Sequence, residues 1–287
     1  MAKYKIFVDT AADMPQELAD KHGIGIINFM SVFGEEAFVA GVELTNSEFY
    51  KKLEESKDIP TTSQTPYAEF YDILKKASDE NDTVIYFTIS SKASGQHNTA
   101  CMVREEILEE NPKADIRIVD TMSFSVFITS AAIYAKELID AGEDIDTAIE
   151  KAKKHIESYT AYILVDTLKY LEKGGRINKT TAIIGSMLDI KPVLTIKDGL
   201  VESAEKLRGR KKIYKKLIEL IRENPDFDEE NPDFMIAHSS VEYCNELKEA
   251  LKEEFGIEDI KYCLEFGPIV GTHIGPGVIG VLFKLKK

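Results

Sequence analysis

The feature that most constrains this chain is an apolar strand that runs into a helix through a short loop of small hydroxyl residues. Residues 84–89 read VIYFTI, a β-branched and aromatic run that is typical of a buried strand. Residues 96–108 place apolar side chains at helical spacing, and the loop between, residues 90–95, reads SSKASG. Such a loop aims N–H groups and hydroxyls beyond the carboxyl edge of a sheet, where anions bind, so we interpret it as a candidate anion site.

This loop also has a purely local interpretation. Serine is a common N-cap residue, so Ser94 would simply cap the helix that follows. A second hydroxyl-rich loop, residues 59–66 (IPTTSQTP), also leads into a helix, with Thr65 as the expected cap and Pro66 at the first helical position. Two such loops strengthen the anion-site interpretation, provided that they converge in the fold.

Strands and helices alternate along the first half of the chain. Strands are expected at residues 4–8, 24–28, 84–89 and 116–119, with amphipathic helices between them. This alternation predicts an α/β fold whose N-terminal part is a mostly parallel sheet flanked by helices.

The pattern changes near Asp146. A polar helix leads to a strand at residues 161–165, and Asp198-Gly199 between two apolar runs indicates a β-hairpin. The second half therefore resembles an α+β domain with a partly antiparallel sheet. The predicted domains are an N-terminal α/β domain at residues 1–158 and a C-terminal α+β domain at residues 159–287.

The composition argues against several classes of partner and site. A formal net charge of −14 disfavours a nucleic-acid backbone or an anionic membrane surface as the main partner, because both would repel the chain. The three cysteines are widely spaced, and no signal or membrane-spanning segment is evident, so we expect a cytoplasmic protein without a disulfide framework. The sequence contains no phosphate-loop, dinucleotide-binding or Gly-x-Ser-x-Gly motif, so we expect no cofactor and no metal site.

A few polar residues outside the two loops are candidates for function. His273 lies in the run GTHIGPG, where we expect a loop whose imidazole reaches a ligand or, alternatively, faces solvent. Arg176 follows a Gly-Gly helix end and would donate to an anion or a partner, or else only complement the helix dipole. Residues 206–216 hold seven basic residues and no acid, which is typical of a solvated face or a docking segment.

Taken in order, these segments resemble the DegV family of bacterial fatty-acid-binding proteins, the FakB-like subunits that serve a fatty acid kinase. The resemblance spans essentially the whole chain. It rests on Asp9-Thr10 with Asp13, Thr61-Thr62-Ser63-Gln64, Ser90-Ser91 with Ser94-Gly95, Asp120-Thr121, residues 168–176, Lys191-Pro192 and His273-Ile274-Gly275-Pro276-Gly277. The residues that flank Ser94-Gly95 differ from those usual in the family; they are Lys92-Ala93 and Gln96-His97.

The resemblance implies two domains that hold a long-chain fatty acid in a buried pocket between them. The residues that it assigns to the fatty acid carboxylate are Thr62, Ser63, Ser94, Gly95 and His273. Those that it assigns to the kinase-binding surface are Arg176 and Arg208. The chain would then be a lipid-binding carrier and not an enzyme. It would present the carboxylate to a separate ATP-dependent fatty acid kinase and leave with the acyl phosphate.

Two other functions are open at this point. The first is a serine hydrolase or acyl transferase with Ser94 as nucleophile and His273 as base. It requires these side chains within hydrogen-bond reach and a third group that orients the imidazole. The second is a regulatory protein that binds a lipid and then a partner other than a kinase, which the basic segment would suit.

Overall fold

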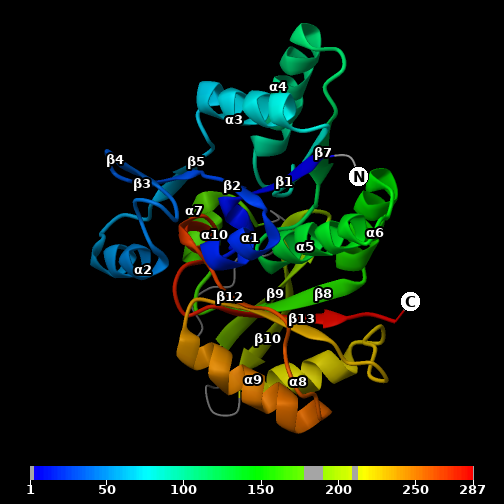
Figure 1. Ribbon diagram of the computed structural model, residues 1–287. Coiled ribbons are helices and arrows are strands. Elements are labelled where there is room, and N and C mark those ends of the chain that lie inside the picture. Colours follow the sequence, from blue (N-terminus) through cyan, green and yellow to red (C-terminus); the bar gives the residue numbers. More distant parts are fainter. Residues whose placement is uncertain (1–2, 178–189, 209–212, 287) are drawn as a thin grey trace.

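The computed structural model describes residues 3–177, 190–208 and 213–286. Residues 209–212, in the middle of the basic segment noted in the sequence, lie outside this described part. Within it, the chain forms three sheets and the helices that cover them (Figure 1). No helix in the described ranges is long and apolar enough to cross a membrane.

A four-stranded parallel sheet organises the first half of the chain. Its strand order is β2-β1-β6-β7, and every neighbouring pair is parallel. The strands are β1 (Tyr4–Asp9), β2 (Gly25–Ile27), β6 (Thr83–Thr88) and β7 (Ile116–Asp120). All of β6 is buried, so the strand that leads into the candidate anion loop lies inside the sheet. The predicted parallel sheet is confirmed.

Helices cover both faces of this sheet. They are α1 (Gln16–His22), α3 (Tyr67–Glu80), α4 (Gln96–Glu110), α5 (Val126–Asp140) and α6 (Ile145–Glu157), with a short 3-10 turn, η1 (Thr10–Ala12), after β1. Helices α3 and α4 lie together on one face, where Phe70, Leu74 and Val103 pack against the strands. Helix α5 covers the other face, and α6 packs along α5 (Figure 1).

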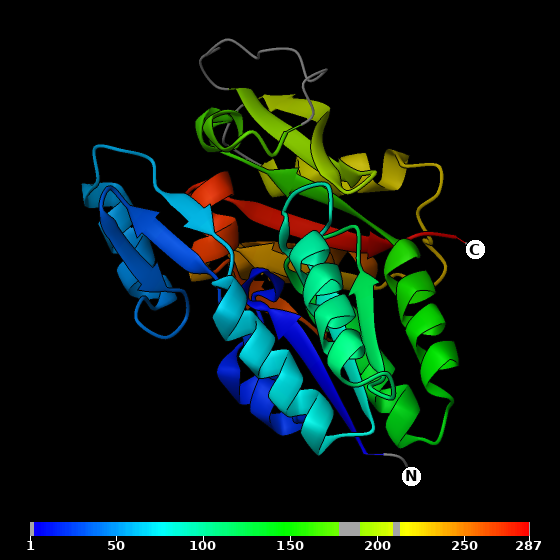
Figure 2. The same ribbon diagram turned by 90° about the horizontal axis from the view of Figure 1, so that it is seen from above.

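A small antiparallel sheet stands beside the parallel one (Figure 2). Its order is β4-β3-β5, from β3 (Met30–Phe33), β4 (Glu36–Val39) and β5 (Thr61–Ser63), and α2 (Asn46–Glu55) packs against it. The predicted loop at 59–66 is therefore wrong at β5, because the pairing of Thr62 with Ser31 is a non-local contact that local pattern does not encode. The predicted cap is also wrong. The Thr65 hydroxyl donates to the Asn28 carbonyl at 2.7 Å, and Pro66 occupies the N-cap position of α3.

The second half of the chain forms a six-stranded mixed sheet. Its order is β10-β9-β8-β13-β11-β12, and only the β11–β12 pair is parallel within this sheet. The strands are β8 (Tyr159–Leu164), β9 (Ile190–Lys197), β10 (Leu200–Arg208), β11 (Phe234–His238), β12 (Cys263–Glu265) and β13 (Ile279–Lys284). The helices are α7 (Lys169–Gly174), α8 (Ile213–Glu223), α9 (Val241–Phe255) and α10 (Pro268–Ile274). The predicted second domain with a partly antiparallel sheet is confirmed.

The two large sheets share one buried core. Helices α8 and α9 cover the outer face of the six-stranded sheet. Its inner face contributes Leu194 and Leu282 to the same apolar cluster as Phe87 of β6 and Ala131 of α5. Helix α10 comes from the second half of the chain but contacts η1, α2, β3 and β5 of the first half. The exact division at residue 158 stays a prediction.

Candidate functional site

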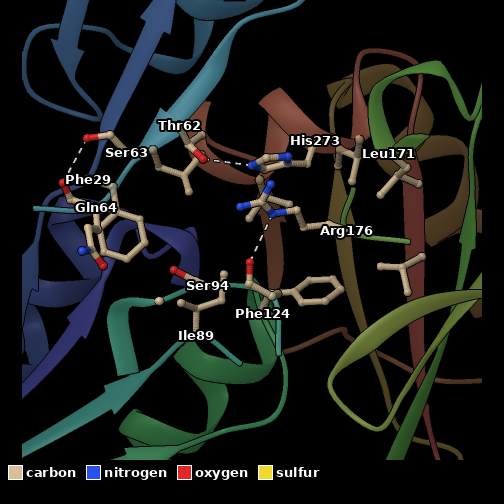
Figure 3. Close-up of a pocket in the computed structure, with 16 residues that line it drawn as sticks. Phe29, Thr62, Ser63, Gln64, Ile89, Ser94, Phe124, Leu171, Arg176 and His273 are labelled. Carbon is tan, nitrogen blue, oxygen red and sulfur yellow. Dashed lines mark hydrogen bonds between the residues drawn. The ribbon is translucent and has the colours of Figure 1, made fainter. Parts of the chain in front are cut away.

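A cavity of about 330 Å³ lies where the two halves of the chain meet. This volume is in the range of pockets that hold small-molecule ligands, roughly 300–1,000 Å³. Its wall is mostly apolar. The first half contributes Phe29, Ile89 and Phe124, and the second half contributes Leu171, Val201, Ile269, Val270 and Ile274. Polar side chains gather at one part of the wall, among them Thr62, Ser94 and His273 (Figure 3).

Thr62 and His273 are joined by a hydrogen bond across the two halves of the chain. Thr62 lies on β5, and its Oγ1 is 2.9 Å from Nε2 of His273 on α10 (Figure 3). The predicted loop around His273 is wrong, because residues 268–274 form a helix. Gly271 serves close packing there and not a turn: a Cβ on this residue would lie 2.6 Å from the Phe49 ring.

The imidazole of His273 is neutral at physiological pH. Burial, with a smaller contribution from the positive charge of Arg176, lowers the pKa of His273 to about 4. Nδ1 is buried and has no hydrogen-bond partner among the described residues. A proton on Nδ1 would be an unpaired buried donor, so we assign the proton to Nε2, from which it is donated to Thr62 Oγ1. The Thr62 O–H is then free to donate into the cavity.

Ser94 lies in the turn that precedes α4. Its Oγ accepts the backbone N–H of Gln96 at 3.2 Å, so its own proton is available to another acceptor. Ser94 therefore supports the start of the helix, as the local interpretation predicts, and also lines the cavity. Gly95, the N-cap residue of α4, lines the same cavity. The first N–H groups of a helix have no partner within it, which adds donors at this point.

Ser63 is in a different situation from Thr62 and Ser94. It lines the cavity, but its hydroxyl donates to the Gln64 carbonyl at 3.2 Å (Figure 3). Of the three hydroxyl residues predicted for the site, two thus have a proton free for a ligand. The two hydroxyl segments line the same cavity, so the condition that the anion-site interpretation set is met, and the binding roles themselves stay predictions.

Arg176 lines the cavity beside His273, at an exposed position. Its guanidinium donates to the Ala93 carbonyl at 3.2 Å and also to the Gly174 carbonyl. The sequence placed it on a partner-binding surface, and the structure adds that it borders the ligand cavity. Arg208, at the end of β10, is exposed and is not part of the cavity wall.

The described residues of the cavity wall carry no negative charge, although the protein as a whole is acidic. The chain has a net charge of −14, yet none of the described residues that line the cavity is an Asp or Glu, and Arg176 is the one charged residue among them. A cavity of this kind favours an apolar ligand that carries a negative group.

The geometry required for a hydrolase with Ser94 as nucleophile and His273 as base is not present in the described part of the chain. No Ser94–His273 hydrogen bond occurs there: Nε2 of His273 contacts Thr62, and Nδ1 has no carboxylate to orient the ring. The described residues also include no group of three or more His, Cys, Asp or Glu side chains placed to hold a metal ion.

Sequence reasoning missed most of the apolar wall. Phe124 lies just before α5 and borders the cavity. Phe29 lies between β2 and β3, and Val201 lies on β10. Residues of this kind look the same in the sequence whether they fill a core or line a cavity, so no local signal distinguishes them.

Comparison with known proteins places this arrangement in a family. The DegV family model, described as a family of uncharacterised proteins, matches residues 3–286. A DegV domain-containing protein from Clostridium perfringens is 33% identical over 288 residues, which cover 99% of this chain and 98% of that protein.

Solved structures show the same fold. DegV from Bacillus subtilis, described as a fatty acid binding protein, has a TM-score of 0.85 and 27% identity over 100% of both chains. A protein from Eubacterium ventriosum, described as stearic acid-binding, has a TM-score of 0.89 and 25% identity over 99% of this chain and 98% of its own. This chain belongs to the DegV family.

Proposed function

We propose that this protein binds a long-chain fatty acid in the cavity, with the carboxylate held by Thr62, Ser94 and the backbone of Gly95. The observation that carries the proposal is an apolar cavity with free hydroxyl protons at one part of its wall and no acidic side chain along the rest. Family members described as binding fatty acids, in Bacillus subtilis and Eubacterium ventriosum, support it.

The acyl chain supplies the affinity in this proposal. Each buried CH₂ group contributes about 0.8 kcal/mol, so a long chain contributes on the order of 10 kcal/mol before the cost of association. Side chains such as Phe29, Phe124 and Ile269 provide the apolar surface for it. This contribution does not distinguish an acid from an alcohol or an ester of the same length.

The polar groups supply the selectivity for an acid. A carboxylate that leaves water needs hydrogen-bond donors, and charge-assisted bonds to hydroxyl and N–H groups are stronger than neutral ones. Thr62 and Ser94 each have a hydroxyl proton to donate, and Arg176 adds a positive charge at the border of the cavity. His273 acts as a neutral donor that orients Thr62 and does not itself supply a charge.

The finer proposal is that this chain is a carrier subunit and not itself an enzyme. It presents the fatty acid carboxylate to a separate ATP-dependent fatty acid kinase in the cytoplasm and carries the acyl phosphate away. The absence of a nucleotide-binding motif in the sequence supports the need for a separate kinase. Arg176 and Arg208 would lie on the kinase-binding surface, since both are exposed.

Calorimetric titration with fatty acids and with the matching alcohols tests the binding proposal. We expect stoichiometric binding of a long-chain acid and at least tenfold weaker binding of the alcohol, because the alcohol lacks the anionic group. Equal affinity for acid and alcohol would contradict the assigned carboxylate site.

The kinase proposal needs its own experiment. A pull-down with a bacterial fatty acid kinase compares the wild type with Arg208→Glu, which leaves the cavity wall intact. We expect Arg208→Glu to bind the fatty acid with unchanged affinity and to bind the kinase no longer. Unchanged kinase binding in both Arg208→Glu and Arg176→Glu would contradict the assignment of these residues to the kinase-binding surface.

A further inference from the structure

The start of α10, the helix that carries His273, is held by a carboxyl group from the opposite end of the chain. Asp13 ends η1 with a left-handed backbone (φ 52°) and is only 8% exposed. Its Oδ1 accepts the backbone N–H of Gly267, the N-cap residue of α10, at 2.8 Å. A Cβ on Gly267 would lie 3.2 Å from the same oxygen, so the Asp13 carboxylate packs closely against the backbone of Gly267.

Two further side chains of the first half hold the same approach to α10. The hydroxyl of Tyr50 donates to the carbonyl of Phe266 at 3.0 Å, and the amide of Asn46 donates to Glu265 at 3.0 Å. Both side chains come from α2. The segment from Glu265 to Gly267 is thus tied to α2 and η1 immediately before the helix begins.

The other end of α10 leaves the imidazole of His273 little room. Its Nε2 is bonded to Thr62, and its Nδ1 lies 2.4 Å from the position that a Cβ on Gly174 would occupy. Because the ring is confined between β5 and α7, a shift at the start of this short helix would change the Thr62–His273 contact. Interiors packed this closely transmit such shifts.

Asp13 occupies a position that is costly for a charge. Burial, with smaller contributions from the negative charges of Asp9 on β1 and Glu265 on β12, raises the pKa of Asp13 to about 7. The Ser125 side chain and the Gly267 N–H act on this pKa in the opposite direction. Ser125 beside α5 and Tyr50 on α2 also lie next to it, and Oδ2 has no hydrogen-bond partner among the described residues. Since the folded-state pKa is above the usual value, the stability contribution of this group is lost as the pH rises towards and through 7.

We propose that Asp13 is a positioning residue for the carboxylate site: by accepting the Gly267 N–H it fixes the start of α10 and so keeps His273 bonded to Thr62. The proposal rests on the proposed function, because Thr62 matters only if its hydroxyl meets the ligand. Asp13 itself is not part of the cavity wall.

A double-mutant cycle with His273 tests this proposal. We expect Asp13→Ala to weaken fatty acid binding about tenfold, and Asp13→Asn, whose side-chain oxygen can still accept from Gly267, to stay within about threefold of the wild type. In a His273→Ala background, Asp13→Ala should have less than about a twofold further effect, since Asp13 acts through His273. A full further loss in that background, or no loss in the wild type, would overturn the proposal.

Two measurements separate this outcome from general destabilisation and from failure of the proposed function. Leu247→Ala, on the buried face of α9 and in a different apolar cluster from the residues of α10, should lower the unfolding temperature without changing affinity. The second is the His273 Nε2–H signal in the ligand-free protein, observed by ¹⁵N NMR. We expect the His273 Nε2–H proton to be no longer protected from exchange with water in Asp13→Ala. In Asp13→Asn we expect the proton to stay protected. An unchanged signal in Asp13→Ala would overturn the proposal even if the wild type bound no fatty acid.

Discussion

The polar and the apolar parts of the cavity wall differ in how many residues form them and in what binding requires of each residue. The polar part consists of a few groups on separate short elements, β5, the turn before α4, and α10, which only the complete fold brings together. The apolar part consists of a larger number of side chains, which come from both halves of the chain. Hydrogen bonds depend on single atoms, whereas apolar burial depends on area. The comparison therefore predicts that single substitutions in the polar part strongly weaken binding. Substitutions in the apolar part should have smaller effects.

Removing both free hydroxyls should have the largest effect. Each hydrogen bond to a charged group contributes about 1.5–3 kcal/mol, so Thr62→Ala with Ser94→Ala should weaken binding on the order of 100-fold or more. Calorimetry measures the loss. The matched control is Thr61→Ala with Ser91→Ala, which removes exposed hydroxyls from the same two segments and should leave affinity unchanged. Equal effects of the two double variants would show that the head-group site lies elsewhere.

Displacing His273 without removing it should have the next largest effect. A methyl group at residue 174 would lie 2.4 Å from Nδ1 of His273, so Gly174→Ala should push the ring from Thr62 and weaken fatty acid binding about tenfold. Titration of the same fatty acid measures it. In a His273→Ala background, Gly174→Ala should change fatty acid affinity little, because the imidazole that it would displace is absent. A full additional loss in that background would contradict the assignment.

Changes in the apolar wall should alter chain preference more than head-group binding. Val201 lines the cavity and is 3% exposed, so Val201→Phe should reduce the space for the chain. We expect about tenfold weaker binding of an 18-carbon acid but less than about twofold for a 12-carbon acid. Val201→Ala should shift the preference towards the longer acid. An equal loss for both lengths would show that this side chain does not limit chain length.

The smallest expected effect is an absence of titration at His273. Because burial lowers its pKa to about 4, the ring should stay neutral between pH 5.5 and 8, and its ¹⁵N shifts should not move. The same histidine should titrate near its usual value of about 6.5 in the urea-unfolded protein. Since the folded-state pKa is the lower one, this group's contribution to stability is lost as the pH falls from about 6.5 towards 4. A midpoint near 6.5 in the folded protein would make His273 a cationic ligand group.

The sequence predicted the fold better than the site because most of the fold follows local rules. The parallel strands and the Asp198-Gly199 hairpin have period and turn signals that act over a few residues. The strand at Thr61–Ser63 was missed because its partner is β3, and His273 was placed in a loop because glycines that serve close packing resemble turn glycines. The resemblance to the family, and not periodicity, brought Thr62, Ser94 and His273 together in one prediction.

Native mass spectrometry of the freshly purified protein tests the central claim most directly. The account predicts a one-to-one complex whose mass exceeds that of the protein by one long-chain fatty acid. Denaturing extraction should release that fatty acid. It also predicts that the variant lacking both the Thr62 and the Ser94 hydroxyls retains much less of it. A wild-type protein that carries no fatty acid and takes up none when long-chain acids are added would contradict the account.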